Sequence, residues 1–353
     1  MKRLSLLILL LMALPLSALA VPSTPYVSST VLGYDSLTPA VQSLVDVIYE
    51  GVSSHRETIS LPGGSKYNDA DQAVRFVLQA YPELPETANS WTISYYSNHP
   101  DEATSVTVSY MRSQAEDQRR QDQALARAKA LQPQDLSGFE LELQLHDTLC
   151  AATVYNLQAD GCSTAWGALV GGQALCEGYA KAFTLLCRVG GIPCGVISGV
   201  AMDTDGSVQN HAWVEVELGG AVYTVDPTWD DQEFGVVHYY FNLSREEANR
   251  DHQADADTPV MGQDAGDAME YHRYLGLACT QSEADSLFLS LLGQVGQGSD
   301  LIELRLTQGS ATAFAQRLGD LLDRYNRSGG SLYGSYTYSV NEEQGCLRFL
   351  WEG

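Results

Sequence analysis

The chain has 353 residues, of which 44% are hydrophobic, so it is long and apolar enough to form two or three folded domains. It carries 44 acidic and 20 basic side chains, a formal net charge of -24. A surface this acidic repels nucleic acid and anionic membranes, which excludes nucleic-acid-binding functions from our expectations.

Residues 1–20 have the features of a cleavable secretory signal. Met1-Lys-Arg is followed by a Leu-rich stretch and then by Ser17-Ala-Leu-Ala20. A basic start, a short apolar core and an Ala-x-Ala ending are typical of such signals. No later apolar run is long enough to cross a bilayer. We therefore expect a secreted or extracellular protein, associated with the cell surface at most, with no stable membrane insertion after the signal is removed.

The next part of the chain is predicted to form a small module of helices and strands. Residues 21–38 are polar and are predicted to be a linker, and residues 39–112 show alternating helical and strand periodicities. Residues 113–133 are predicted to be a charged, Ala-rich connector helix. Within the module we expect helices at 40–52 and 69–81, strands at 58–61, 91–97 and 105–110, and a loop at 98–102.

Residues 134–255 are predicted to be the central domain, because Ser137-x-x-Glu140 is a capping box that begins a helix extending to about Tyr155. A linker is expected at 256–280. Residues 281–353 then repeat the element order of the first module, from duplication or convergence; two unrelated appended domains are the alternative. The expected elements are helices at 282–292 and 311–325 and strands at 301–306, 333–340 and 346–350.

The sequence does not determine which cysteines, if any, form disulfides. If Cys176 is set aside, six cysteines remain, which allow three disulfides in fifteen pairings; free buried thiols are the alternative. Cys187 lies about three helical turns beyond Cys176, which excludes a CxxC-type redox pair between them.

Cys176 is the most distinctive of these cysteines. Gly171-Gly172 interrupts the chain just before it, and a helical pattern extends from Cys176 to Val189. Unpaired N–H groups and the dipole at a helix N-terminus favour a thiolate, which is the nucleophilic form of cysteine. The backbone N–H of Cys176 could also face a developing oxyanion.

A predicted hairpin brings the other two polar residues together. Gly219-Gly220 separates two strand-like runs, and a two-residue turn there fixes the pairing. His211 and Asp226 then become diagonal neighbours on one face, within side-chain reach. The pairs predicted on the opposite, apolar face are Val214 with Val225, Val216 with Tyr223, and Leu218 with Ala221.

These residue types suit thiol catalysis, with Cys176 as nucleophile, His211 as base and Asp226 as the group that orients the imidazole. A structural zinc site is the alternative, but it would need a fourth ligand and usually more than one cysteine. We expect no metal and no organic cofactor.

Four motifs in order resemble the bacterial transglutaminase-like superfamily, over roughly residues 137–255. Tyr239-Tyr-Phe-Asn-Leu-Ser and a later His252 are similar to the tail of that family. The motifs are Ala165-Trp-Gly-Ala-Leu-Val-x-Gly-x-Ala-x-Cys-x-Gly-Tyr-Ala180, Gly191-Ile-Pro-Cys194, Asn210-His-Ala-Trp213 and Val225-Asp-Pro-Thr-Trp229.

The resemblance implies an α+β fold: a papain-like transglutaminase core, in which the nucleophile helix packs on an antiparallel sheet, flanked here by two small α+β modules. It assigns Cys176, His211 and Asp226 the roles given above. Residues that could line the cleft are Trp166, Gln173, Tyr179 and Trp213, with core packing as the alternative for Tyr179 and Trp213.

The activity implied is acyl transfer through a thioester. We expect hydrolysis of a peptide, protein or cell-wall peptide amide outside the cell, as by a cysteine peptidase or amidase. The alternatives are a protein-crosslinking transglutaminase and a catalytically silent module that binds peptide or cell wall.

Overall fold

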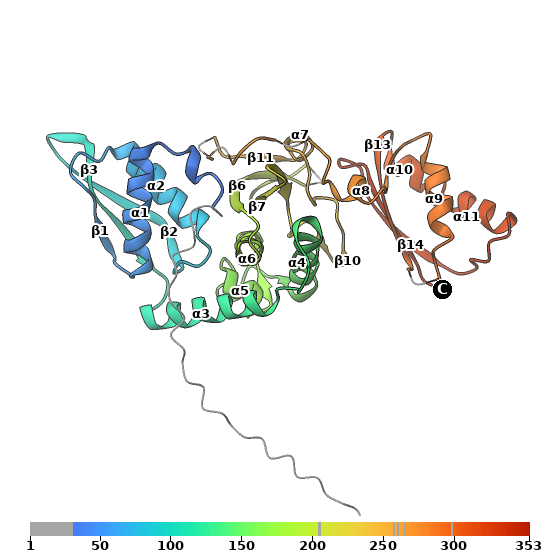
Figure 1. Ribbon diagram of the computed structural model, residues 1–353, viewed down its shortest axis with the longest axis horizontal. Coiled ribbons are helices and arrows are strands. Elements are labelled where there is room, and N and C mark those ends of the chain that lie inside the picture. Colours follow the sequence, from blue (N-terminus) through green and yellow to red (C-terminus); the bar gives the residue numbers. More distant parts are fainter. Residues whose placement is uncertain (1–30, 204–205, 257, 260, 265, 298) are drawn as a thin grey trace, which may run out of the picture.

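The computed structural model describes residues 31–203, 206–256, 258–259, 261–264, 266–297 and 299–353. The predicted secretory signal and most of the predicted linker after it lie outside these residues. Three units lie in a row along the long axis of the molecule, in chain order (Figure 1). Each unit has its own apolar core.

The N-terminal unit confirms the predicted order of helices and strands. Its strands form an antiparallel sheet in the order β1-β3-β2. The loop predicted at 98–102 is wrong, because β3 already begins at His99, directly after a turn at 97–98. The ladder shifts register near this end, and such irregularity accommodates Pro100, which lacks an N–H to donate. The elements are α1 (Pro39–Ser53), β1 (Thr58–Ser60), α2 (Tyr67–Ala80), β2 (Thr87–Tyr96) and β3 (His99–Tyr110).

Helix α3 (Gln114–Ala130) is more than the predicted connector. Ser113 caps its N-terminus by accepting a hydrogen bond from the N–H of Glu116. Ala124 and Ala128 are buried in the apolar core of the central unit, where α3 packs on α5 and α6. In Figure 1, α3 runs beneath the central helices. The helix therefore belongs to the central unit by its packing.

The central unit packs helix α6 on strands β6 and β7 of an antiparallel sheet with the order β11-β6-β7-β8. This is the α+β arrangement expected from the sequence. The unit contains α4 (Gly138–Ala152), β4 (Val154–Tyr155), α5 (Ala165–Leu169), β5 (Gln173–Ala174), α6 (Cys176–Val189), β6 (Cys194–Met202), β7 (Val208–Leu218), β8 (Ala221–Val225) and β11 (His252–Ala254).

The predicted capping box at the start of α4 does not form. Ser137 is the N-cap residue, but its side chain accepts no capping hydrogen bond. The Glu140 carboxylate instead accepts a hydrogen bond from the hydroxyl of Tyr274, at 2.9 Å. The helix also ends at Ala152, before the predicted Tyr155, because Thr153 is extended and the next two residues form β4, which pairs with β5.

The hairpin of β7 and β8 has the predicted register. Val214 pairs with Val225, Val216 with Tyr223, and Leu218 with Ala221. Gly219 and Gly220 have φ angles of 62° and 85°, which the favoured two-residue hairpin turn requires and which glycine adopts without steric cost.

The C-terminal unit forms a sheet in the order β12-β13-β15-β14. Its last three strands have the same antiparallel order as β1-β3-β2 in the N-terminal unit, which is compatible with duplication and with convergence. The helix predicted at 311–325 is two helices, divided at Gln316 and Arg317. The elements are α9 (Ala284–Leu292), β13 (Leu301–Gln308), α10 (Ala311–Ala315), α11 (Leu318–Arg327), β14 (Tyr336–Asn341) and β15 (Cys346–Trp351).

The stretch predicted as a linker at 256–280 is partly ordered and buried. It contains α8 (Tyr271–Tyr274) and β12 (Ala278–Thr280), which pairs with β13. Glu270 and His272 are fully buried and hydrogen-bonded to each other. Short elements between β8 and β11 are β9 (Asp231–Gln232), β10 (Gly235–Val236) and α7 (Arg245–Ala248).

All seven cysteines are unpaired thiols, and five of them are buried. Of the two alternatives, three disulfides or free thiols, the structure has free thiols. Among the described residues, every helix is too short or too polar to span a membrane.

The backbone of α6 at Gly178 lies very close to the backbone of Cys162, so a substitution of Gly178 tests the packing between these two segments. A Cβ atom at Gly178 would lie far inside van der Waals contact with the carbonyl oxygen of Cys162. We expect Gly178→Ala to lower the free energy of unfolding by about 1–3 kcal/mol, because overpacking shifts the backbone. Gly63→Ala is the control, since a Cβ there meets nothing within 4 Å. Equal denaturant midpoints for the two variants would contradict this packing.

Candidate active site

Cys176 is the first residue of α6. The residue before it, Leu175, is held in extended conformation by a hydrogen bond from its N–H to the carbonyl of Cys162, at 3.0 Å. Cys176 is half-buried. The first N–H groups of a helix have no partner within the helix, which leaves donors here for an anion.

His211 lies on β7, paired with Gly199 of β6, and is buried. Its Nε2 atom lies 2.6 Å from Oδ2 of Asp226. The side chain of Cys176 is close enough to this imidazole to help raise its pKa. The structure therefore brings together the three residues that the sequence singled out, with His211 between the other two.

Asp226 directly follows β8 and is fully buried. Its Oδ1 atom accepts hydrogen bonds from the backbone N–H groups of Thr228 and Trp229, at 2.9 and 3.2 Å. Its Oδ2 atom faces two imidazoles, those of His211 at 2.6 Å and His252 at 3.1 Å. Burial alone would raise the pKa of this carboxyl, but the two imidazoles hold the pKa well below its usual range.

The charge state of His211 follows from its neighbours. Burial lowers the pKa of an imidazole, because the charged form is desolvated. Here the charge and hydrogen bond of Asp226, with a smaller contribution from Cys176, outweigh burial and raise the pKa of His211 to about 10. At neutral pH the imidazole is therefore protonated, as a thiolate–imidazolium pair requires.

His252 is the residue at this site that the sequence did not mark as functional. The sequence placed it only in the family-like tail, because 41 residues separate it from His211. In the structure β11 pairs with β6, which places His252 beside Ala201 and its ring 5.5 Å from that of His211. A strand pairing of this kind has no local sequence signal.

Aromatic rings enclose the imidazole. The rings of Trp213 and Trp229 lie 6.1 and 5.2 Å from the ring of His211. Trp213 is only 3% exposed, so it packs in the interior and does not line an open cleft. This low-dielectric surround strengthens the pairing of His211 with Asp226.

The other proposed cleft residues also have structural partners. The ring of Trp166 lies under the guanidinium of Arg120, 4.0 Å from its ring centre. Gln173 is exposed and accepts a hydrogen bond from the amide of Asn156, at 2.6 Å. Tyr179 is fully buried and donates its hydroxyl to Asp231. Of the two alternatives for Tyr179 and Trp213, core packing is therefore the one observed.

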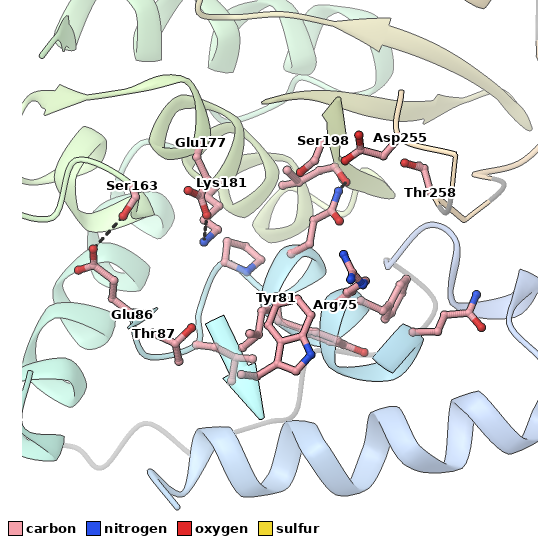
Figure 2. A pocket seen from close by; sticks show the side chains of 18 of the residues that line it. Arg75, Tyr81, Glu86, Thr87, Ser163, Glu177, Lys181, Ser198, Asp255 and Thr258 are labelled. Carbon is pink, nitrogen blue, oxygen red and sulfur yellow. Dashed lines mark hydrogen bonds and ion pairs between the residues drawn. The ribbon is translucent and has the colours of Figure 1, made fainter. Parts of the chain in front are cut away.

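A cavity of about 580 Å³ lies between the N-terminal unit and the central unit. Figure 2 shows Glu177 and Lys181 of α6 facing Tyr81, Arg75 and the segment around Glu86. Glu177 and Lys181 form an ion pair of 2.7 Å. Glu177 follows Cys176 directly in α6, whereas Cys176, His211 and Asp226 are not among the residues that line the cavity. None of the four cleft residues expected from the sequence lines it.

Two groups of side chains have donor atoms close enough to hold a metal ion, among the residues that the structure describes. One is His211, Asp226 and His252; the other is His146, Asp147 and His238. In the second group Asp147 Oδ1 lies 3.0 Å from a nitrogen of each histidine, and every remaining ring nitrogen faces another carboxylate. Hydrogen bonds and ion pairs account for this arrangement, and we assign no metal to it.

Comparison with solved structures gives partial likenesses. A proposed cysteine protease from Cytophaga hutchinsonii is 16% identical, with 42% of this chain and 64% of that chain covered and a TM-score of 0.28. The periplasmic domain of TgpA from Pseudomonas aeruginosa is 22% identical, with 36% and 56% covered and a TM-score of 0.26. A TGase is 14% identical, with 41% and 45% covered and a TM-score of 0.28. We draw no conclusion about activity from likeness at this level.

Comparison with curated proteins gives no significant match. The sequence profile of the transglutaminase-like superfamily matches residues 123–227. This stretch contains Cys176, His211 and Asp226, and it begins within α3, whose alanines pack in the central core. The similarity to the transglutaminase-like superfamily therefore lies in the central unit of this chain, together with part of α3.

Proposed function

We propose that this protein is an exported cysteine enzyme that hydrolyses peptide or protein amides through a thioester on Cys176. The observation that carries the proposal is the contact of His211 with both Cys176 and the buried carboxylate of Asp226. A half-exposed thiol at a helix N-terminus, beside an imidazolium, is the arrangement that activates cysteine nucleophiles.

In the acylation step the Cys176 thiolate attacks the amide carbonyl carbon, and a carbon–sulfur bond forms. The carbonyl oxygen becomes an oxyanion next to the N–H groups at the start of α6. The carbon–nitrogen bond then breaks, and the His211 imidazolium gives its proton to the leaving amine. Asp226 keeps the imidazole in place throughout, since its carboxylate is held by two backbone N–H groups.

In the deacylation step a water molecule attacks the thioester while neutral His211 takes a proton from it. The carbon–sulfur bond breaks and the thiolate is restored beside an imidazolium. Water has access to a half-exposed thioester in any case, whereas transamidation requires the site to bind an amine as well. Hydrolysis is therefore the outcome we propose, and amine transfer is the alternative that the experiments below separate from it.

The cavity beside Glu177 is the place we propose for the substrate chain. Its walls combine three aromatic rings and three prolines with ion-paired side chains, which suits a peptide with polar and apolar groups. The walls come from both the N-terminal unit and the central unit, so the N-terminal unit would take part in substrate selection.

The reactivity of Cys176 tests the proposal directly. A thiol with an ordinary pKa of about 8.5 is less than about 1% thiolate at pH 6 and reacts slowly with iodoacetamide. We expect fast labelling of Cys176 at pH 6 in the folded protein, read by peptide mass, with half-buried Cys162 as the internal control.

Cys176→Ala should abolish turnover of a peptide pool while the melting temperature is retained. Slow labelling of a reduced, accessible Cys176 would favour the silent binding module. Incorporation of a fluorescent primary amine in place of hydrolysis would favour a transglutaminase.

Replacement of the orienting carboxylate should be nearly as damaging. Asp226→Asn replaces one of the two accepting oxygens by an NH2 group, so either the two imidazoles or the two backbone N–H groups lose their acceptor, and His211 is no longer held in the productive orientation. We expect kcat to fall by about 10³–10⁴-fold, as in other triads. Steady-state kinetics on a folded variant measure this fall, and an unchanged kcat would mean that another residue orients His211.

Partial filling of the cavity should affect binding without affecting the thiol. Gln72 is an exposed residue of α2 that lines the cavity. We expect Gln72→Trp to raise KM for peptides several-fold and to leave iodoacetamide labelling of Cys176 unchanged, because the small reagent does not need the cavity. Glu50→Trp, on the exposed side of α1 and away from the cavity, is the matched control. An unchanged KM would place the substrate elsewhere.

A further inference from the structure

A buried chain of hydrogen bonds begins at Asp226 and ends in the C-terminal unit. His252 Nε2 lies 3.1 Å from Asp226 Oδ2, and His252 Nδ1 lies 2.6 Å from Asp251 Oδ1. The other oxygen of Asp251 accepts hydrogen bonds from the Tyr240 hydroxyl, at 2.9 Å, and from the Gln344 amide, at 3.1 Å. Gln344 is fully buried, although it lies in the turn between β14 and β15.

The two carboxylates determine the protonation of His252. A neutral imidazole has one N–H, so it can donate to only one of two acceptors. His252 has an acidic partner at each nitrogen, and the two partners raise its pKa against the opposing effect of burial. The titratable groups around it are Asp226, Asp251, Tyr240 and His211; the rings of Trp213 and Trp229 add no charge. An acceptor at each ring nitrogen favours the imidazolium form of His252, beside Asp226 and His211.

Gln344 is held firmly in position to reach this chain. Its backbone N–H donates to the side chain of Asn341, at 2.9 Å, and the Asn341 amide donates to the Tyr240 hydroxyl, also at 2.9 Å. The Gln344 amide also donates to the carbonyl of Glu247, at 3.3 Å. Asn341 and Gln344 therefore both have side-chain partners in the central unit.

A buried ion-pair network fixes the C-terminal sheet against the central unit. Arg305 of β13 is 1% exposed, and its guanidinium lies 3.1 Å from Glu247 and 3.2 Å from Glu270. Arg273 adds a further contact with Glu247, at 2.9 Å. Because separation of buried charge pairs is costly, the C-terminal unit is held in one position, and so is the amide of Gln344.

We propose that the C-terminal unit completes the active site: Gln344 positions Asp251, and Asp251 holds His252 as the cation that fixes Asp226 against His211. Gln344 is a positioning residue in this scheme, since it touches neither substrate nor a reacting atom. The catalytic consequence rests on the function proposed above, while the charge of His252 can be measured without it.

The test compares Gln344→Met and Asp251→Asn with Gln316→Met in the full-length protein. Gln316 is an exposed glutamine of the same unit and serves as the matched control. We expect Gln344→Met to lower kcat about tenfold, the size of one lost hydrogen bond to a charged group, and to leave KM unchanged. Gln316→Met should have no effect.

The pH profile separates positioning from a purely structural role. In Asp251→Asn, His252 loses the carboxylate that keeps it charged, so His211 becomes the only cation on Asp226 and should retain its proton to higher pH. We expect the alkaline limb of kcat, in which His211 loses the proton it gives to the leaving group, to move to higher pH in this variant and less so in Gln344→Met. A lower melting temperature with unchanged kcat and unchanged pH profile would overturn the proposal.

A measurement on the unmodified protein keeps the two proposals distinct. Nitrogen chemical shifts of the histidine rings report which of them are imidazolium, with His252→Gln assigning the signal. An imidazolium at His252 at pH 7 supports the inference even if Cys176 proves unreactive, and a neutral His252 overturns it whatever the activity.

Discussion

The carboxylate of Asp226 is the group on which the site depends. It is fully buried, and a charge in that position is tolerated only when hydrogen bonds and opposite charges replace the lost water. Two backbone N–H groups hold one oxygen, and two imidazoles share the other. The same contacts give His211 its raised pKa and thus its proton at neutral pH. The contacts that allow Asp226 to be charged and buried are thus the same contacts that hold His211 in place.

The three units take different parts around that carboxylate. The central unit supplies helix α6 with Cys176 and the sheet with His211. The N-terminal unit forms the far wall of the cavity beside Glu177, through α2 and the segment 82–88. The C-terminal unit presents a polar face of its sheet, with Arg305 and Gln344 directed into the central unit. The C-terminal unit thereby gains a hydrogen-bonded connection to Asp226 that its sequence does not indicate.

Close backbone packing explains why small residues precede and follow the nucleophile. Gly178 lies against the carbonyl of Cys162, and the N–H of Leu175 donates to that same carbonyl. These contacts hold the first turn of α6 against the segment before α5. A rigid first turn is useful here, because an oxyanion is stabilised only by donors that are already in place when its charge develops.

Local patterns were enough to predict much of this molecule. The Gly219-Gly220 turn with its apolar alternation determined the register of β7 and β8, and that register placed His211 within reach of Asp226. The glycine break before Cys176 marked the start of α6. Predictions from local patterns failed where residues distant in sequence supply the partners. The capping box predicted at Ser137 does not form. The stretch predicted as a linker at 256–280 contains Glu270, which is buried against Arg305. Only the tertiary structure brought His252, Asp251 and Gln344 together, because strand pairing and interdomain charge burial join residues that no sequence period relates.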